Sequence, residues 1–242
     1  IVDLGGGTSD FVVARLSPER ARLADRSQDI LGRTGVHIGG TDFDRQLSIA
    51  QVMPHLGYFT RVGEKQLPMP RHLYHDLATW HLIPSVYTPD NLRYLRHVLP
   101  MAEEPHLIRR LIDVLTNRKG HHIASEVEAA KIALSDRPQT VLRIPLSDAV
   151  ETPITASDLD QVVQEDAGRI VDAIDRCLKT AGVKPDDIHS IFLTGGPTAI
   201  AEVRRQILAH VPQARPVTGD LFGSVGLGLA LDAERRFGAD TI

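Results

Sequence analysis

Apolar residues recur on one helical face over residues 159–181, and this long helix is the strongest constraint on the fold of the chain. The spacing is typical of a helix packed on a core, and Gly182 and Pro185 end it. An apolar run over residues 188–193 then predicts a buried strand, and a Thr-Gly-Gly-Pro turn leads into a further helical pattern over residues 200–208. This alternation of helix, buried strand and helix predicts an α/β domain.

The first 40 residues have a different pattern, in which short β-rich stretches are separated by turns. We expect strands at residues 1–4, around residues 11–13 and around residues 21–30. A turn at Gly39-Gly40 precedes a helical pattern over residues 41–52. The predicted order is three strands, an insertion, a helix, a strand and two helices, with the last helix after Asp220.

The insertion is recognised by its prolines, because seven of them interrupt short segments between residues 53 and 105. Helical periodicity returns over residues 106–117 and 120–135, and residues 139–154 predict a β-hairpin. We therefore expect one subdomain made of residues 1–50 and 155–242. The inserted subdomain, residues 51–154, should be mostly helical with a β-hairpin.

Composition excludes several classes of partner. The net charge of -4, with acidic and basic residues interspersed, supplies no broad cationic field, so nucleic acid is not an expected partner. No apolar run approaches the roughly 18 residues of a membrane span, so a membrane is not expected either. The single cysteine, Cys177, cannot form a disulfide within the chain, which fits a reducing, cytoplasmic location. Because the chain opens directly on a strand, we expect it to begin in the middle of a larger protein.

The segment Asp-Leu-Gly-Gly-Gly-Thr-Ser-Asp, residues 3–10, carries the clearest chemistry. Glycines allow positive φ angles and close approach to a ligand, so the N–H groups of residues 5–7 can converge on phosphate oxygens. Thr8 adds a hydroxyl donor. Asp3 and Asp10 suit Mg²⁺, which binds one or two carboxylates and keeps several waters. A plain hairpin turn with acidic edges is the alternative interpretation.

This motif resembles the second phosphate loop of the actin-like ATPases, in the form found in DnaK-type heat-shock chaperones. Three further segments resemble that family in the same order: Gly39-Gly40-Thr41-Asp42-Phe43-Asp44, the adenosine helix with Glu128, Lys131 and Ser135, and the adenosine loop Gly195-Gly196-Pro197-Thr198, followed by Asp220 and Gly226. Taken singly, Glu128 and Lys131 could be a solvated helix pair. Gly195-Gly196 could likewise be an ordinary turn between a strand and a helix.

Several stretches, including L-G-R-T-G-V-H-I-G-G and F-L-T-G-G, are similar to the YegD-type chaperone-like proteins. The resemblance implies the second lobe of an actin-like ATPase, ribonuclease H-like, with an inserted helical subdomain; the first lobe is absent and becomes a partner. It also implies ATP or ADP with Mg²⁺ as ligands. Asp3 would orient the attacking water or the metal's water shell, and Asp10 would hold magnesium through water. The phosphates would lie on Gly5, Gly6, Gly7, Thr8, Gly39 and Gly40, and the rest of the nucleotide on Glu128, Lys131, Ser135, Gly195, Gly196, Pro197 and Asp220.

The chain departs from the family pattern where two arginines enclose the adenine, because Ile132 and Ala199 occupy those positions. Stacking on a guanidinium is commonly worth about 0.5–2 kcal/mol, so adenosine affinity should be reduced. Pro197 also removes a hydroxyl and a backbone N–H.

Three functions follow from the resemblance. The first is an ATP-dependent chaperone-like ATPase with protein clients or co-chaperones, in which this lobe alone does not hydrolyse ATP. The second is a non-hydrolysing scaffold that binds partners through the inserted subdomain. The third is a small-molecule kinase of the same fold, such as a sugar kinase, which the E-A-A-K-I-A-L-S helix disfavours.

Overall fold

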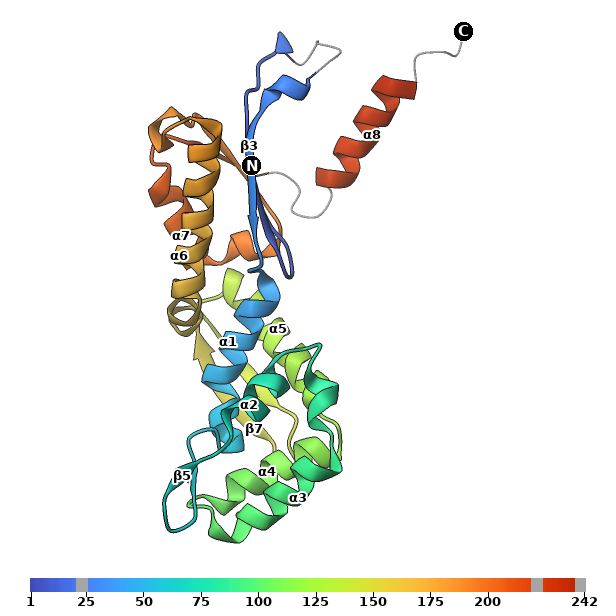
Figure 1. Cartoon of the computed structure of the whole chain (residues 1–242), viewed down its shortest axis with the longest axis vertical. Helices are drawn as coiled ribbons and strands as arrows, with labels where there is room; N and C mark the ends of the chain where they lie inside the picture. The colour runs from blue at the N-terminus through green and yellow to red at the C-terminus, as the bar shows by residue number, and fades with distance from the viewer. Residues whose placement is uncertain (21–25, 219–223, 238–242) are drawn as a thin grey trace. The chain divides into compact units, whose positions relative to one another are not determined.

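The computed structural model describes residues 1–20, 26–218 and 224–237. Contacts divide the chain into two compact units, one made of residues 1–40 and 164–242 and the other of residues 41–163. Figure 1 shows the elements of both units. Each unit is described by itself below.

The first unit is built on a mixed five-stranded sheet with the strand order β3-β2-β1-β8-β9. Strand β2 is antiparallel to both β1 and β3, whereas β8 is parallel to β1 and β9 is parallel to β8. The bounds are β1 Val2–Leu4, β2 Ser9–Ala14, β3 Ile30–Val36, β8 Ser190–Thr194 and β9 Arg215–Thr218. Four strands are therefore parallel to one another: β1, β3, β8 and β9. Their carboxyl ends lie along the same end of the sheet, which we call the carboxyl edge.

Three α-helices belong wholly or partly to this unit: α6 Ala156–Ala181, α7 Ala201–His210 and α8 Ser224–Phe237. Helix α6 is the long helix that the periodicity predicts, and it ends before Gly182, which adopts the left-handed φ of 67°. Its apolar face is buried at Ile170, Ile174, Cys177 and Leu178. Burial of one such side chain is worth about 1.5–3 kcal/mol. Short 3-10 helices cover Ser27–Asp29, Pro185–Asp187 and Gly196–Ala199.

The third strand lies later in the sequence than the pattern indicated. We expected it around residues 21–30, of which residues 21–25 lie outside the described part; Ser27–Asp29 form a 3-10 helix and the strand begins at Ile30. Gly32 and Gly35 lower the β-propensity of the true strand, which is why it escaped detection. A Cβ atom at Gly32 would lie 2.9 Å from the backbone of α6 at Cys177 and Ala181, so close packing of strand on helix requires glycine there.

The second unit is mostly helical. Its α-helices are α1 Gly40–Gln51, whose first residue belongs to the first unit, α2 Arg71–Ala78, α3 Pro89–Val98, α4 Pro105–Thr116 and α5 Gly120–Asp136. Thr88 caps α3, because its hydroxyl accepts a hydrogen bond from the N–H of Asn91 at 3.1 Å, and Pro89 occupies the first helical position. Short 3-10 helices cover Met53–Leu56, Ile83–Val86 and Leu99–Met101. None of the described helices is both long enough and apolar enough to cross a membrane.

The predicted β-hairpin is confirmed as strands β6 Gln139–Ile144 and β7 Val150–Thr155, which pair antiparallel. Two features were not foreseen: the two-residue strands β4 Arg61–Val62 and β5 Leu67–Pro68, and the sheet strand β9. Strand β9 begins Arg-Pro, and proline is tolerated there because β9 lies at the edge of the sheet.

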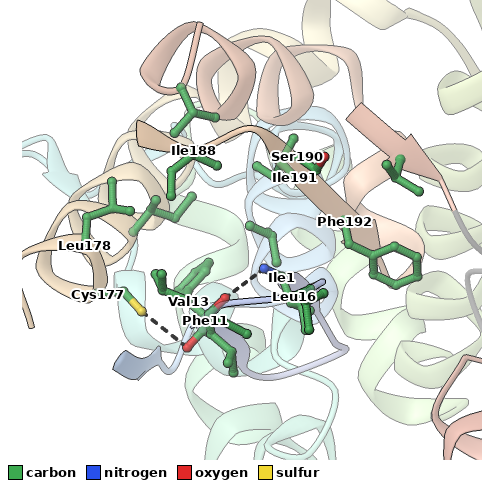
Figure 2. Close-up of a pocket in the computed structure, with 16 residues that line it drawn as sticks. Ile1, Phe11, Val13, Leu16, Cys177, Leu178, Ile188, Ser190, Ile191 and Phe192 are labelled. Atoms are coloured by element: carbon green, nitrogen blue, oxygen red, sulfur yellow. Dashed lines mark hydrogen bonds between the residues drawn. The ribbon is translucent and has the colours of Figure 1, made fainter. Parts of the chain in front are cut away.

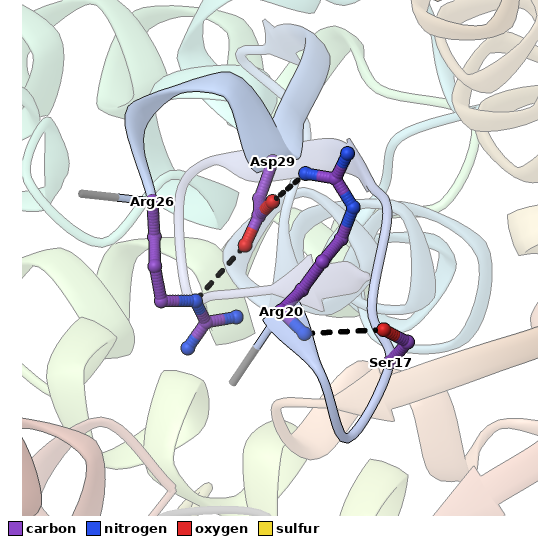
Figure 3. A network of polar contacts seen from close by, with 4 residues as sticks. All are labelled: Ser17, Arg20, Arg26 and Asp29. Carbon is purple, nitrogen blue, oxygen red and sulfur yellow. Dashed lines mark hydrogen bonds and ion pairs between the residues drawn. The ribbon is translucent and has the colours of Figure 1, made fainter. Parts of the chain in front are cut away.

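A small ionic network holds the start of β3 (Figure 3). The buried carboxylate of Asp29 accepts hydrogen bonds from Arg20 and from Nε of Arg26, the latter at 2.9 Å. The N–H of Arg20 in turn donates to Oγ of Ser17 at 3.2 Å. The pKa of Asp29 lies below its usual range, chiefly because of the hydrogen bond from Arg26 and secondly because of that from Arg20.

The network predicts a pH-dependent contribution to stability. A depressed carboxylate pKa stabilises the fold above the unfolded-state pKa of about 3.9, and this contribution disappears as the pH falls through the folded-state pKa. The variant Asp29→Asn should therefore be less stable than wild type at pH 7, and the difference should shrink as the pH falls below about 3.9 towards the folded-state pKa. Urea unfolding between pH 7 and pH 3 measures it, with Arg26→Gln expected to behave alike. A difference that stays constant with pH would contradict the prediction.

Candidate functional site

A tight turn follows β1 at the sheet edge where the parallel strands end. The N–H of Gly5 donates to the carbonyl of Thr8 at 2.8 Å, which closes the turn. Gly6, Gly7 and Thr8 are exposed, and a Cβ atom at Gly6 or Gly7 would meet nothing within 4 Å. The tip of the turn is thus open on one side and has no side chain to shield its backbone.

The Gly39-Gly40 segment supports this turn from behind. A Cβ atom at Gly39 would lie 2.6 Å from the backbone of Gly6 and Gly7, so the two chain segments pack backbone against backbone. The N–H of Gly40 donates to the carbonyl of Gly5 at 3.0 Å. Glycine is therefore needed at position 39 for this close approach.

The expectation of positive φ angles in the turn is wrong. Glycines with positive φ occur at Gly57, Gly63, Gly182 and Gly195 among the described residues, and none lies in the turn. The turn closes through the hydrogen bond from Gly5 to Thr8 without a positive φ angle. Its glycines provide space instead of unusual geometry.

Two carboxylates lie side by side at the start of the turn. Asp3 in β1 is directly opposite Asp10 in β2, and Asp3 is level with Thr194 in β8. Asp10 is in turn opposite Gly35 in β3, where a Cβ atom would approach Oδ1 of Asp10 to 3.0 Å. Residues in register share a face of the sheet, so this face carries a row of glycine, two carboxylates and a hydroxyl.

The pair of Asp3 and Asp10 places two negative charges opposite each other. Like charges directly opposite each other destabilise a sheet. Among the described residues, the hydroxyl of Thr8 contacts this pair and donates a long hydrogen bond to Oδ2 of Asp10 at 3.4 Å. Across the described ranges no group of three or more His, Cys, Asp or Glu side chains could hold a metal ion. Two carboxylates beside an open turn instead fit Mg²⁺, which takes one or two carboxylates and completes its shell with water and phosphate oxygens.

A second loop follows β8 at the same carboxyl edge. Gly195 has a φ of 86°, and a Cβ atom there would collide with the carbonyl of Leu4 at the end of β1. The hydroxyl of Thr198 donates to the carbonyl of Gly195 at 2.7 Å and fixes the loop. Pro197 and Thr198 are buried, Gly196 is half-buried and Ala199 is exposed. Asp220, also predicted to contact the nucleotide, lies outside the described residues.

The remaining predicted residues lie on α5 in the second unit. The ammonium of Lys131 is buried and lies 2.8 Å from both carboxylate oxygens of Asp44, with a well-formed hydrogen bond to Oδ2 alone. Burial raises the pKa of Asp44, and the charge of Lys131 opposes that shift. Lys131 therefore has a structural partner within its own unit, which the sequence did not reveal.

Glu128 and Ser135 differ in their surroundings. Glu128 is exposed and lines a groove with Asp44, Trp80 and His121. The hydroxyl of Ser135 donates to the carbonyl of Lys131 at 3.3 Å, one turn earlier in the same helix. Ile132 is 58% exposed.

Sequence reasoning missed Thr194 and Gly35 as members of the carboxylate row. Thr194 stands just before Gly195-Gly196 at the end of an apolar run, so its place at the end of a buried strand was a usable signal. Gly35 carried no such signal, because its role depends on the register between β2 and β3.

The fold and site together define an α/β domain with an open glycine turn at the carboxyl ends of its parallel strands. The chain belongs to the Hsp70 family: the family described as Hsp70 protein matches residues 102–233, more than half of the 242 residues.

Individual relatives agree with this assignment. The chain is 32% identical over 108 residues to a chaperone protein HscA homolog of Bordetella pertussis, covering 43% of this chain and 17% of that protein. It is 30% identical over 125 residues to the mitochondrial iron-sulfur cluster biogenesis chaperone of Saccharomyces cerevisiae, covering 50% and 17%. Over 245 aligned residues it is 24% identical to the chaperone protein DnaK of Thermus thermophilus, covering 96% and 30%. The chain thus spans less than a third of the length of these relatives.

The backbone contact behind the turn predicts a contrast between two glycines. Gly39→Ala forces a methyl group into the Gly6-Gly7 backbone and should destabilise the fold by about 1–3 kcal/mol. Gly7→Ala places its methyl group in open space and should stay within about 0.5 kcal/mol of wild type. Urea unfolding of both variants measures the contrast. Equal stabilities would show that Gly39 does not support the turn.

The Lys131–Asp44 pair predicts a stability effect in the second unit. Lys131→Met leaves the largely buried carboxylate of Asp44, which is 17% exposed, without its ammonium partner and should cost about 3 kcal/mol at pH 7. Without its partner Asp44 has a still higher folded-state pKa, so the loss should shrink as the pH falls through that value and the carboxylate becomes neutral. Denaturant unfolding at pH 7 and pH 5 measures this. The double variant with Asp44→Leu should recover much of the loss, and a failure to recover would contradict the pairing.

Proposed function

We propose that this chain is the nucleotide-binding second lobe of an ATP-dependent chaperone ATPase of the Hsp70 family, of the YegD type. Its ligands are ATP or ADP and Mg²⁺. The observation that carries the proposal is the pairing of Asp3 with Asp10 beside an open glycine turn. The turn gives phosphate oxygens access to backbone, and the carboxylates offset the charge of a divalent cation.

Each part of the edge has a distinct proposed role. Gly5, Gly6, Gly7 and Thr8 hold the phosphates, supported by Gly39 and Gly40. Asp3 orients the water that attacks the terminal phosphate or the water shell of the metal, and Asp10 holds magnesium through water. Bound Mg²⁺ supplies neutralisation of the phosphate charge. Thr194, level with Asp3, adds a hydroxyl to the same face.

The nucleoside contacts are proposed for Glu128, Lys131, Ser135, Gly195, Gly196, Pro197 and Asp220. The structure qualifies two of these roles. Lys131 shares its ammonium with Asp44, and the hydroxyl of Ser135 is donated to its own helix. Ile132 and Ala199 are each exposed and apolar, so neither of them offers a cation to the base.

Hydrolysis is proposed for the full-length protein only. The chain covers 30% or less of the relatives compared above, and the first lobe of the ATPase is a required partner in this proposal. Protein clients or co-chaperones are the further partners. Alone, the chain binds nucleotide phosphates weakly and does not turn ATP over.

Calorimetry with ADP in the presence and absence of Mg²⁺ tests the proposal on the chain. Asp10→Asn should reduce the magnesium-dependent part of the affinity about tenfold, which corresponds to about 1.4 kcal/mol. Asp186→Asn, an exposed carboxylate preceding β8, is the matched control and should leave binding unchanged. Equal effects of the two variants would exclude the carboxylate pair as the magnesium site. Steady phosphate release by the chain alone, abolished by Asp3→Asn, would overturn the assignment of hydrolysis to the full-length protein.

A non-hydrolysing scaffold is the second candidate, favoured by exposed apolar side chains. Ile132 replaces a cation, and Phe59 and Trp80 of the inserted unit are 71% and 57% exposed. No binding of nucleotide at millimolar concentration to the full-length protein would favour the scaffold. If nucleotide does bind, Ile132→Arg should strengthen ADP binding several-fold by restoring stacking.

A further inference from the structure

Two hollows of the described structure differ in chemistry. The one in the first unit has apolar walls that include Phe11, Leu178 and Ile191 (Figure 2), and such walls give a ligand neither charge nor direction. The other lies in the second unit along helix α3 and carries arginines. A charged surface selects its ligand by charge, so the second hollow is the more specific of the two.

One face of α3 forms this second hollow, which we call the α3 groove. Its lining residues recur at helical spacing, and they are Pro89, Leu92, Arg93 and Arg96, with Tyr87 just before the helix. The volume of about 430 Å³ lies within the roughly 300–1,000 Å³ of typical ligand sites. The α3 groove thus combines an apolar lining with two guanidinium groups.

The charge of these two arginines is barely neutralised within the chain. Arg93 forms an ion pair with Asp90 at 2.9 Å, but the two side chains are 77% and 82% exposed, and pairs so open to water contribute little. Arg96 is exposed and pairs with no carboxylate in the part of the chain that the structure describes. A carboxylate from outside can therefore replace Asp90 at Arg93 and meets no competitor at Arg96.

A third arginine is joined to the α3 groove through Tyr87. The guanidinium of Arg118 lies 5.8 Å from the centre of the Tyr87 ring, and the same tyrosine lines the groove. The hydroxyl of Tyr87 accepts a hydrogen bond from the N–H of Gly120 at 2.9 Å, which holds the ring in place. Arg118 is exposed and has no ion pair among the described residues. Three arginines thus stand close to one apolar lining.

The backbone at Arg118 indicates a use for this side chain beyond stability. Its φ of 50° lies in the left-handed region. Helix α4 ends here, and the N–H of Lys119 donates to the carbonyl of Val114 at 3.0 Å, so Arg118 occupies the position after the helix at which glycine is favoured. A side chain in this conformation costs stability, and such strained positions gather at functional sites. The guanidinium of Arg118 is therefore a candidate for ligand binding.

We propose that the α3 groove binds an acidic segment of a partner protein. Carboxylates of that segment pair with Arg93, Arg96 and Arg118, because guanidinium groups match carboxylates in bidentate geometry. An apolar side chain between the carboxylates packs on Leu92 and on the ring of Tyr87. A polypeptide suits the groove better than nucleic acid does, since the lining is partly apolar and the chain as a whole carries a net charge of -4. The groove shares no residue with the proposed nucleotide site and does not rest on nucleotide binding.

Fluorescence anisotropy with a labelled peptide, Gly-Asp-Glu-Leu-Glu-Asp-Gly, tests the proposal on the chain. The affinity should fall as salt is raised, and the neutral peptide Gly-Asn-Gln-Leu-Gln-Asn-Gly should bind at least about tenfold more weakly. Arg96→Gln should weaken binding of the acidic peptide roughly fivefold. The matched control is Arg143→Gln, which removes an exposed arginine from β6 and should leave binding unchanged.

Arg118→Gly separates binding from stability. Glycine adopts the left-handed φ without strain, so the thermal midpoint of this variant should lie at or above that of wild type. Its affinity for the acidic peptide should nevertheless fall several-fold. A midpoint several degrees below wild type would mark Arg118 as a structural residue and would overturn its place in the site.

Three results with the peptides would overturn the proposal as a whole. They are no binding of the acidic peptide, equal binding of the acidic and neutral peptides, and equal weakening in Arg96→Gln and Arg143→Gln. An oligothymidine of equal charge that binds more tightly than the acidic peptide would also overturn it, since the groove would then be a nucleic-acid surface.

Discussion

The parallel alignment of β1 with β8 is the constraint on which the rest of the first unit depends. Because β1, β3, β8 and β9 run the same way, the turn after Leu4, the Gly39-Gly40 support and the loop at Gly195 all emerge at one edge. The same alignment brings Asp3 level with Thr194 while β2 brings Asp10. Residues nearly 200 positions apart in the sequence become one polar surface through backbone pairing alone.

Much of this fold can be predicted from the sequence, because strong periodicity and clear stop signals are local. Helix α6 and the β6-β7 hairpin appear where their patterns indicate. The prediction failed where tertiary contacts override propensity. Strand β3 contains Gly32 and Gly35, which weaken any strand pattern. A side chain at position 32 would clash with α6, and one at position 35 would crowd the carboxylate of Asp10.

The candidate site also has a part that the sequence predicts and a part that it does not. Its turn and first carboxylates form a contiguous motif, so residues 3–10 could be selected directly. The partner of Lys131 could not, since Asp44 is 87 residues away and the pair forms only when α1 and α5 pack in the second unit. The φ angles of the turn were also beyond reach, because glycine permits several conformations and its neighbours decide among them.

The contact of Gly195 with the carbonyl of Leu4 has a consequence for how this domain can diverge. At Gly195 the second loop lies directly against the backbone at the end of β1. Position 199 is exposed and can change from a charged residue to alanine without moving the carboxylate row. In the proposed function, phosphate binding and base recognition therefore fall to different residues, and the side chain at position 199 can change while the carboxylate row stays in place.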